Sequence, residues 1–357
     1  MTMNRAGRER IRACLTAALL VPCIAGCHGS SAAAPRQVPP PAIDAVRGVH
    51  DPALIKANGV FWLYSTGKGI PIRRSTDLIH WDTAGRVFAT AVPPSAAAAV
   101  PGVEFPWAPD ISLANGRYRL YYSLSTFGSQ RSAIGLATNV TLDPADPRYQ
   151  WADEGVVLQS SPGVSTFNAI DPNVAVDERG NPWLAWGSFW GGLKLRRLDA
   201  ATGKLSTIDT TIYSLAARAG TDVTTGPNDA QAVEASFIVR HGTFFYLFAS
   251  YDLCCRGSSS TYNVRVGRAA AITGPYADMS GVAMTAGGGT IVLQGLGRVR
   301  GPGHCAVISD GAQDYMVHHF YDDLAGGAAT LQVRPVSWTA DGWPVVGEPI
   351  APPPSVP

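Results

Sequence analysis

The chain has 357 residues, a formal net charge of +1 and only 15% charged residues, with its basic residues scattered along the sequence. Proteins that bind nucleic acid normally carry a basic patch, so this distribution argues against a nucleic-acid partner. The low charge content, 38 glycines and 9 tryptophans favour a β-rich exported protein with a neutral ligand.

The N-terminus predicts export. Several arginines precede an apolar stretch over 14–24, which matches the n-region and h-region of a secretory signal and is too short to span a bilayer. The motif Ile24-Ala25-Gly26-Cys27 resembles the lipobox of bacterial lipoproteins. We therefore predict a signal peptide over 1–26 and a lipidated Cys27, whose acyl chains hold the protein at a membrane facing the periplasm or the cell exterior. The alternative is an ordinary secretory signal with an incidental cysteine.

The segment 27–42 continues from the lipidated cysteine and is small and Pro-rich without apolar periodicity, so it predicts a tether. The remaining segment, 43–357, exceeds the usual size of a single-core domain. A closed repeat architecture can add core repeat by repeat and accommodates this length.

Five segments of the chain share one sequence pattern. Each opens with a polar or ionisable residue, continues as a short apolar strand, turns at a glycine and returns as an aromatic-rich strand, which predicts a β-hairpin. The opening residues are Asp51, Asp110, Asp171, Glu234 and His304, about 60 to 70 positions apart. This spacing allows four strands per repeat and predicts an all-β, five-bladed β-propeller. The first strand of each blade lines the axis, so we expect these residues to converge at one mouth of the channel.

Three carboxylates lie within distinctive short sequence motifs. Val49-His50-Asp51-Pro52, Ala169-Ile170-Asp171-Pro172 and Val233-Glu234-Ala235-Ser236 resemble the signatures of glycoside hydrolase family 43. Gly301-Pro302-Gly303-His304, Trp107-Ala108-Pro109-Asp110 and the Cys254-Cys255 pair narrow the resemblance to the endo-α-1,5-L-arabinanases. It covers nearly the whole chain after the tether and implies arabinan or arabino-oligosaccharides as substrate.

The resemblance implies inverting hydrolysis, in which Asp51 is the general base, Glu234 the general acid and Asp171 the carboxylate that orients the acid. The chemistry itself requires two carboxyls about 6.5–9.5 Å apart on opposite faces of the sugar. The alternative reading of these three residues is a set of capping or turn acids.

The resemblance also implies further site residues. Trp107 and Phe127 match positions that line the substrate cleft, with Trp190 as a further candidate, and Asn168 and Ser188 match residues that hydrogen-bond a sugar. Asp110 matches no catalytic role and is expected to line the site or support the structure.

His304 matches a channel histidine that ligates a metal ion, usually calcium, otherwise surrounded by water. Calcium prefers oxygen ligands, and a hydrogen-bonded core histidine is the alternative. Cys254 and Cys255 are adjacent, so a bridge between them is strained. The resemblance implies such a bridge beside the cleft, and reduced thiols are the alternative. We expect Cys305, His318 and His319 to be packing residues.

These observations predict a monomeric arabinan endo-1,5-α-L-arabinosidase with a calcium ion, attached to the membrane only through its lipid. One alternative is an exo-acting α-L-arabinofuranosidase or β-xylosidase of the same family. The other is a surface lipoprotein that binds glycans without cutting them.

Overall fold

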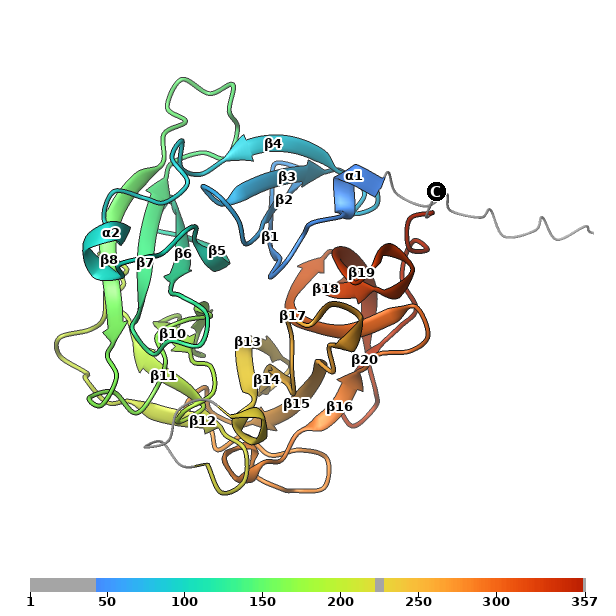
Figure 1. The fold of residues 1–357 in the computed structure, drawn as a ribbon. Coiled ribbons are helices and arrows are strands. Elements are labelled where there is room, and N and C mark those ends of the chain that lie inside the picture. The colour runs from blue at the N-terminus through green and yellow to red at the C-terminus, as the bar shows by residue number, and fades with distance from the viewer. Residues whose placement is uncertain (1–42, 222–227, 356–357) are drawn as a thin grey trace, which may run out of the picture. The chain divides into compact units, whose positions relative to one another are not determined.

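The structure is a computed structural model that describes residues 43–221 and 228–355, so the predicted signal peptide, lipidated cysteine and tether lie outside the described residues. Five four-stranded sheets surround a central axis (Figure 1). Within every sheet the strands pair antiparallel with their sequence neighbours. The predicted five-bladed β-propeller is confirmed.

The blades follow one another in chain order, and each takes four consecutive strands. Blade 1 contains β1 (Ala53–Ala57), β2 (Val60–Tyr64), β3 (Pro71–Ser75) and β4 (Asp82–Arg86). Blade 2 contains β5 (Trp107–Ala114), β6 (Arg117–Leu124), β7 (Ser132–Asn139) and β8 (Ala152–Ser160). Blade 3 contains β9 (Asn173–Val176), β10 (Pro182–Trp186), β11 (Leu193–Arg197) and β12 (Tyr213–Ala216). Blade 4 contains β13 (Val233–His241), β14 (Phe244–Tyr251), β15 (Asn263–Ala269) and β16 (Thr290–Leu293). Blade 5 contains β17 (Val299–Asp310), β18 (Gln313–Asp322), β19 (Ala328–Trp338) and β20 (Pro344–Val346).

The helices in the described residues are short. They are α1 (Ile43–Val46), α2 (Ala96–Ala99) and the 3-10 helices η1 (Asp229–Gln231), η2 (Gly257–Ser259), η3 (Met284–Ala286) and η4 (Asp323–Ala325). None of the described helices has the length and apolar character needed to cross a membrane.

The first two hairpins show why the repeat was visible in the sequence. Asn58 and Gly59 have φ of 51° and 79°, and Asn115 and Gly116 have φ of 52° and 70°. Two consecutive residues with positive φ make a type I′ turn, whose twist matches that of the flanking strands. Local turn chemistry therefore fixes where the innermost hairpins of these blades reverse.

The apolar core lies between neighbouring blades. The aromatic residues of the second strands fill these seams, as where Trp62 and Tyr64 of blade 1 pack with Leu120 and Tyr122 of blade 2. Comparable clusters occupy the other four seams. Each large side chain buried in this way stabilises the fold by about 1.5–3 kcal/mol, so every blade depends on the next one for its stability.

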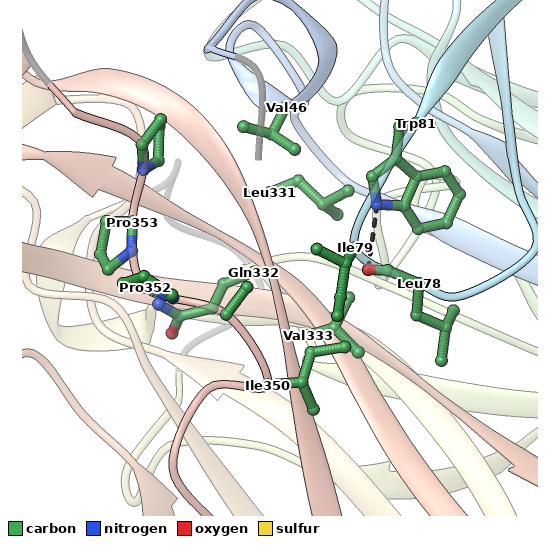
Figure 2. A pocket seen from close by; sticks show the side chains of 12 residues that line it. Val46, Leu78, Ile79, Trp81, Leu331, Gln332, Val333, Ile350, Pro352 and Pro353 are labelled. Carbon is green, nitrogen blue, oxygen red and sulfur yellow. Dashed lines mark hydrogen bonds between the residues drawn. The ribbon is translucent and has the colours of Figure 1, made fainter. Parts of the chain in front are cut away.

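The ring closes where blade 1 meets blade 5. Gly48 donates its N–H to the carbonyl of Ala329 at 2.7 Å, and Val46 packs in one cluster with Leu331. Figure 2 shows Trp81 beside this seam, where its indole donates to the Leu78 carbonyl at 3.1 Å, with the C-terminal prolines nearby. The two ends of the propeller are thus joined by apolar contacts and short backbone pairing.

Candidate active site

The first strand of each blade begins at one end of the channel, and one non-glycine residue close to its start has a left-handed backbone conformation. These residues are Asp51 (φ 50°), Ala108 (φ 43°), Asp171 (φ 58°), Ala235 (φ 56°) and His304 (φ 47°). A left-handed conformation costs a non-glycine residue on the order of 1–3 kcal/mol, so the surrounding structure must compensate for it.

The compensation is a ring of hydrogen bonds between blades. In four cases the left-handed residue donates its backbone N–H to a side chain near the end of the preceding blade's second strand. These bonds join Asp51 to His319 Nδ1 (3.1 Å), Ala108 to Thr66 Oγ1 (2.8 Å), Asp171 to Ser123 Oγ (2.8 Å) and His304 to Ser250 Oγ (2.8 Å). In the fifth case Ala235 donates to Asp171 Oδ2 at 3.2 Å. Neighbouring blades therefore orient each other's site residues.

This ring corrects the repeat alignment at Asp110. The left-handed counterpart of Asp51 in blade 2 is Ala108, two residues earlier, because β5 has an irregularity in its pairing between Trp107 and Asp110. The Asp110 carboxylate accepts from Asn173 Nδ2 at 3.2 Å and from the Val174 N–H at 2.8 Å. The structure therefore gives Asp110 the role of tying blade 2 to blade 3.

Asp51 is buried and surrounded by donors. Its Oδ2 accepts from Thr66 Oγ1 at 2.5 Å, and its Oδ1 faces His50 Nδ1 at 2.8 Å and His304 Nδ1 at 3.1 Å. Burial acts to raise the pKa of Asp51, but the charges and hydrogen bonds of His50 and His304 outweigh it and hold that pKa well below its usual range. Asp51 is therefore a carboxylate at neutral pH.

Glu234 lies on β13, the first strand of blade 4. Its Oε1 accepts from the Tyr262 hydroxyl and its Oε2 from Ser188 Oγ at 2.6 Å. The backbone of Ser188 also forms an isolated bridge with Glu234. The hydroxyl of Ser188, which the family resemblance assigned to a sugar, thus holds the Glu234 carboxyl in this structure.

Asp171 lies between the other two acids along the chain and is electrostatically linked to both. Burial raises the pKa of Asp171 well above its usual value; His304 opposes this shift, whereas Glu234 and Asp51 add to it. Three carboxyls in one buried site cannot all ionise freely, so one of them binds a proton far more readily than it would in water.

His304 is the cation at the centre of this group. Burial acts to lower the pKa of His304, but the carboxylates of Asp51, Asp171 and Glu234 overcome it and raise the pKa to about 9. The structure therefore brings Asp51, Asp171, Glu234 and His304 into one electrostatic group at one end of the channel. Asp110 also interacts with His304, although burial raises the pKa of Asp110 to about 7.

A cation fits His304 only with help from water. Its Nδ1 faces Asp51 Oδ1, so an ion would have to bind at Nε2 and replace the proton that makes His304 a cation, while the nearby carboxylates supply negative charge. The oxygen ligands that calcium prefers would then be water molecules. Among the described residues, His50, Asp51 and His319 also place ligand atoms within 4.8 Å of one another, but His319 Nδ1 already accepts from the Asp51 N–H.

The predicted sugar-contacting residues differ in exposure. Phe127 is 84% exposed and Trp107 is half-buried at the start of β5, so both have apolar surface available. Asn168 is buried, with its Oδ1 3.5 Å from Ser160 Oγ, and Trp190 is buried as well. Phe127 and Trp107 are therefore the better placed candidates for stacking on a sugar.

Cys254 and Cys255 form a disulfide, as the resemblance implies, and Cys255 is exposed. The Cys255 N–H donates to the Tyr321 hydroxyl at 2.8 Å. Cys305 is a free, buried cysteine, and burial raises the pKa of its thiol to about 12.

Sequence reasoning missed several residues that hold the acids in place. Thr66 and Tyr262 were not singled out, and His319 was expected to be a packing residue, although it accepts the Asp51 N–H. The hydroxyl residues that end the second strands of successive hairpins were visible in the sequence. Their function depends on the neighbouring blade, which the sequence of one hairpin does not reveal.

A five-bladed propeller with clustered carboxyls at one mouth defines a class of carbohydrate-cleaving enzymes, and the sequence agrees. The model of Glycosyl hydrolases family 43 matches residues 46–344. The chain belongs to this family and is a glycoside hydrolase.

Similar proteins point to particular activities. An extracellular exo-α-(1→5)-L-arabinofuranosidase of Cellvibrio japonicus is 40% identical, over 84% of this chain and 86% of that protein. An extracellular endo-α-(1→5)-L-arabinanase of Bacillus subtilis is 38% identical, over 83% of this chain and 87% of that protein. The structure of a Cellvibrio cellulosa α-L-arabinanase complexed with arabinohexaose has a TM-score of 0.80 and 39% identity, over 84% of this chain and 95% of that one.

Proposed function

We propose that this protein hydrolyses internal α-1,5-L-arabinofuranosidic bonds of arabinan in a single displacement with inversion. Asp51 removes a proton from the attacking water, Glu234 protonates the departing glycosidic oxygen, and Asp171 orients Glu234 through the backbone of Ala235. The substrate assignment draws on similar proteins that are named for arabinan or solved with arabinohexaose.

The observation that carries the proposal is the different environment of the two reacting acids. Asp51 is surrounded by imidazole nitrogens and a hydroxyl, which favour its charged form and suit a base. Among the described residues Glu234 has no imidazole in hydrogen-bond contact: it accepts from two neutral hydroxyl groups and interacts electrostatically with a second buried acid, Asp171. Two carboxyls in different environments can divide the roles of base and acid between them.

Endo action is supported by exposed apolar surface on more than one blade at the mouth. Phe127 follows β6 in blade 2 and Cys255 follows β14 in blade 4, and both are exposed. A polymer lying across the mouth can contact both. Exo action is the second candidate, because the Cellvibrio japonicus relative is named for it.

Three carboxylate variants test the chemistry. Asp51→Ala and Glu234→Ala should lose nearly all release of reducing ends from debranched arabinan while melting like the wild type. Glu178→Ala, which removes an exposed carboxylate beyond β9, is the matched control and should keep full activity. Near wild-type turnover by Asp51→Ala or Glu234→Ala would refute the assignment.

Product analysis separates the finer alternatives. Mixed oligosaccharides at early times indicate endo action, whereas a single short product from the start indicates exo action. The anomeric configuration of the first product, followed by NMR before mutarotation, must be inverted; a retained anomer would contradict single displacement.

A calcium ion bound at Nε2 of His304 and otherwise hydrated is part of the proposal, with the role of organising the mouth electrostatically. Titration calorimetry with calcium should show binding to the wild type and none to His304→Ala. Equal binding by both proteins would place the ion elsewhere.

Export with a lipid at Cys27 completes the proposal, supported by the lipobox-like Ile24-Ala25-Gly26-Cys27 and by similar proteins named extracellular. Cys27→Ser should move the protein from the membrane fraction to the soluble fraction and abolish incorporation of a labelled fatty acid. Unchanged membrane retention of Cys27→Ser would contradict the anchor. We expect a monomer by size-exclusion chromatography.

A further inference from the structure

A chain of hydrogen bonds connects the disulfide loop to Asp51. The Cys255 N–H donates to the Tyr321 hydroxyl at 2.8 Å, this hydroxyl lies 2.7 Å from His50 Nε2, and His50 Nδ1 lies 2.8 Å from Asp51 Oδ1. The chain crosses from blade 4 through blade 5 to blade 1. It ends on the carboxylate to which we assign water activation.

The number of hydrogens gives this chain a direction. A tyrosine hydroxyl has one hydrogen, and an imidazole that accepts at one nitrogen carries its hydrogen on the other. The oxygen of Tyr321 accepts from the Cys255 N–H, and its own hydrogen faces two acceptors, His50 Nε2 at 2.7 Å and the Cys255 sulfur at 3.7 Å. The imidazole nitrogen is nearer and is the stronger acceptor, so the hydroxyl donates to His50. In its neutral form His50 then carries its hydrogen on Nδ1, and in either protonation state Nδ1 donates to Asp51 Oδ1.

Packing limits the freedom of the same side chains. The ring of His50 stacks on that of His319 with centroids 3.9 Å apart and an interplanar angle of 25°. Tyr321 meets His319 edge-on at 5.3 Å and is only 4% exposed. His319 in turn accepts the N–H of Asp51, so both the backbone and the side chain of Asp51 are held by this stack.

We propose that Tyr321 is a positioning residue for hydrolysis: anchored by the Cys255 N–H, it fixes the orientation and tautomer of His50, which in turn aims the Asp51 carboxylate at the attacking water. This inference rests on the proposed role of Asp51. Tyr321 acts on the reaction through His50 and contacts no reacting atom itself.

A double-mutant cycle tests the inference. Tyr321→Phe keeps the ring packing and removes only the hydroxyl, so kcat on debranched arabinan should fall by about tenfold or more with KM unchanged. His50→Ala should lower kcat at least as much. The double variant should be no slower than His50→Ala, because a residue that acts only through His50 has no effect once His50 is absent.

Tyr276→Phe is the matched control for loss of a buried tyrosine hydroxyl. Tyr276 is 1% exposed and its hydroxyl donates to the Ile272 carbonyl at 2.9 Å, in blade 4 outside the site. It should lose stability like Tyr321→Phe, judged by thermal melting, and keep its kcat. A fall in kcat for Tyr276→Phe equal to that of Tyr321→Phe would reduce the effect to general destabilisation and overturn the inference.

Three other results would also overturn it. These are unchanged kcat in Tyr321→Phe, a rise in KM alone, which would mean that Tyr321 merely shapes the substrate surface, and additive losses in the double variant. Failure of the proposed function is distinguishable, because in that case Asp51→Ala would itself remain active.

Discussion

Thr66 connects the catalytic carboxylate to the neighbouring blade and offers a sharp test of the site. Its Oγ1 donates to Asp51 Oδ2 at 2.5 Å and accepts from the Ala108 N–H at 2.8 Å. Thr66→Val has nearly the same shape and removes both bonds. Loss of a hydrogen bond to a charged group costs about 1.5–3 kcal/mol, and an unsatisfied buried N–H costs about 1–3 kcal/mol.

The expected loss in the free energy of unfolding is therefore about 2.5–6 kcal/mol, or roughly 4–9 °C in melting temperature for a domain of this size. Turnover of arabinan should also fall by about tenfold, since Asp51 loses one of the donors that aims it. Thermal melting and initial rates measure the two effects separately.

Thr66→Ser is the control, because it keeps the hydroxyl and loses only a methyl group. It should lie close to the wild type in turnover. If Thr66→Val melted and turned over like the wild type, the reasoning that inter-blade hydrogen bonds hold Asp51 would be refuted.

Three further changes test the fold. In Gly135→Ala the new Cβ would lie 2.3 Å from the Tyr122 ring, so we expect a loss of about 1–3 kcal/mol in the free energy of unfolding from overpacking, measured by urea denaturation. Asp322→Asn breaks the paired contacts of Arg298 Nε and Nη2 with a fully buried carboxylate (2.5 and 2.6 Å) and should cost about 3–5 kcal/mol by the same assay. Burial lowers the pKa of His318 to about 3, so between pH 3 and 6.5 the unfolded chain binds more protons than the folded protein. The free energy of unfolding therefore falls as the pH is lowered, by about 2 kcal/mol at pH 5. His318→Gln should flatten this dependence of stability on pH.

Each of these three expectations has a clear contrary result. An unchanged urea midpoint in Gly135→Ala would mean that the strands separate freely at this point. Wild-type stability of Asp322→Asn would show that the ion pair adds nothing beyond its desolvation cost. An equal pH slope in the wild type and in His318→Gln would assign the acid sensitivity to other groups.

Local signals made the fold predictable from the sequence. Asn58-Gly59 and Asn115-Gly116 specify tight hairpins by themselves, and the aromatic return strands repeat at a regular spacing. A hairpin that buries aromatic residues on both faces needs neighbours on both sides. The repeat by itself therefore predicts a ring of blades.

The alignment of the site residues between repeats was harder to predict from the sequence. The local sequence Trp107-Ala108-Pro109-Asp110 does not predict a left-handed conformation for Ala108. The irregularity in β5 depends on its pairing with β6 and on the Thr66 hydroxyl of another blade. Asp110 was therefore aligned two residues out of place.

Similarly, His319 was expected to be a packing residue, because its hydrogen-bond partner, the Asp51 N–H, lies 268 positions away in the sequence. Such non-local hydrogen bonds leave no local pattern. The carboxylates themselves were identified because their flanking residues are distinctive in each repeat.

The ring of amide-to-side-chain hydrogen bonds implies that the active site is not assembled until the last blade has folded. Asp51, from the first blade, is completed by His319 of the last, so a nascent chain holds all three acids yet lacks a competent pocket until its final sheet has docked. Hydrolytic activity should therefore appear in a single step at the end of folding. A fragment that lacks one blade should have no hydrolytic activity, even if its remaining sheets fold.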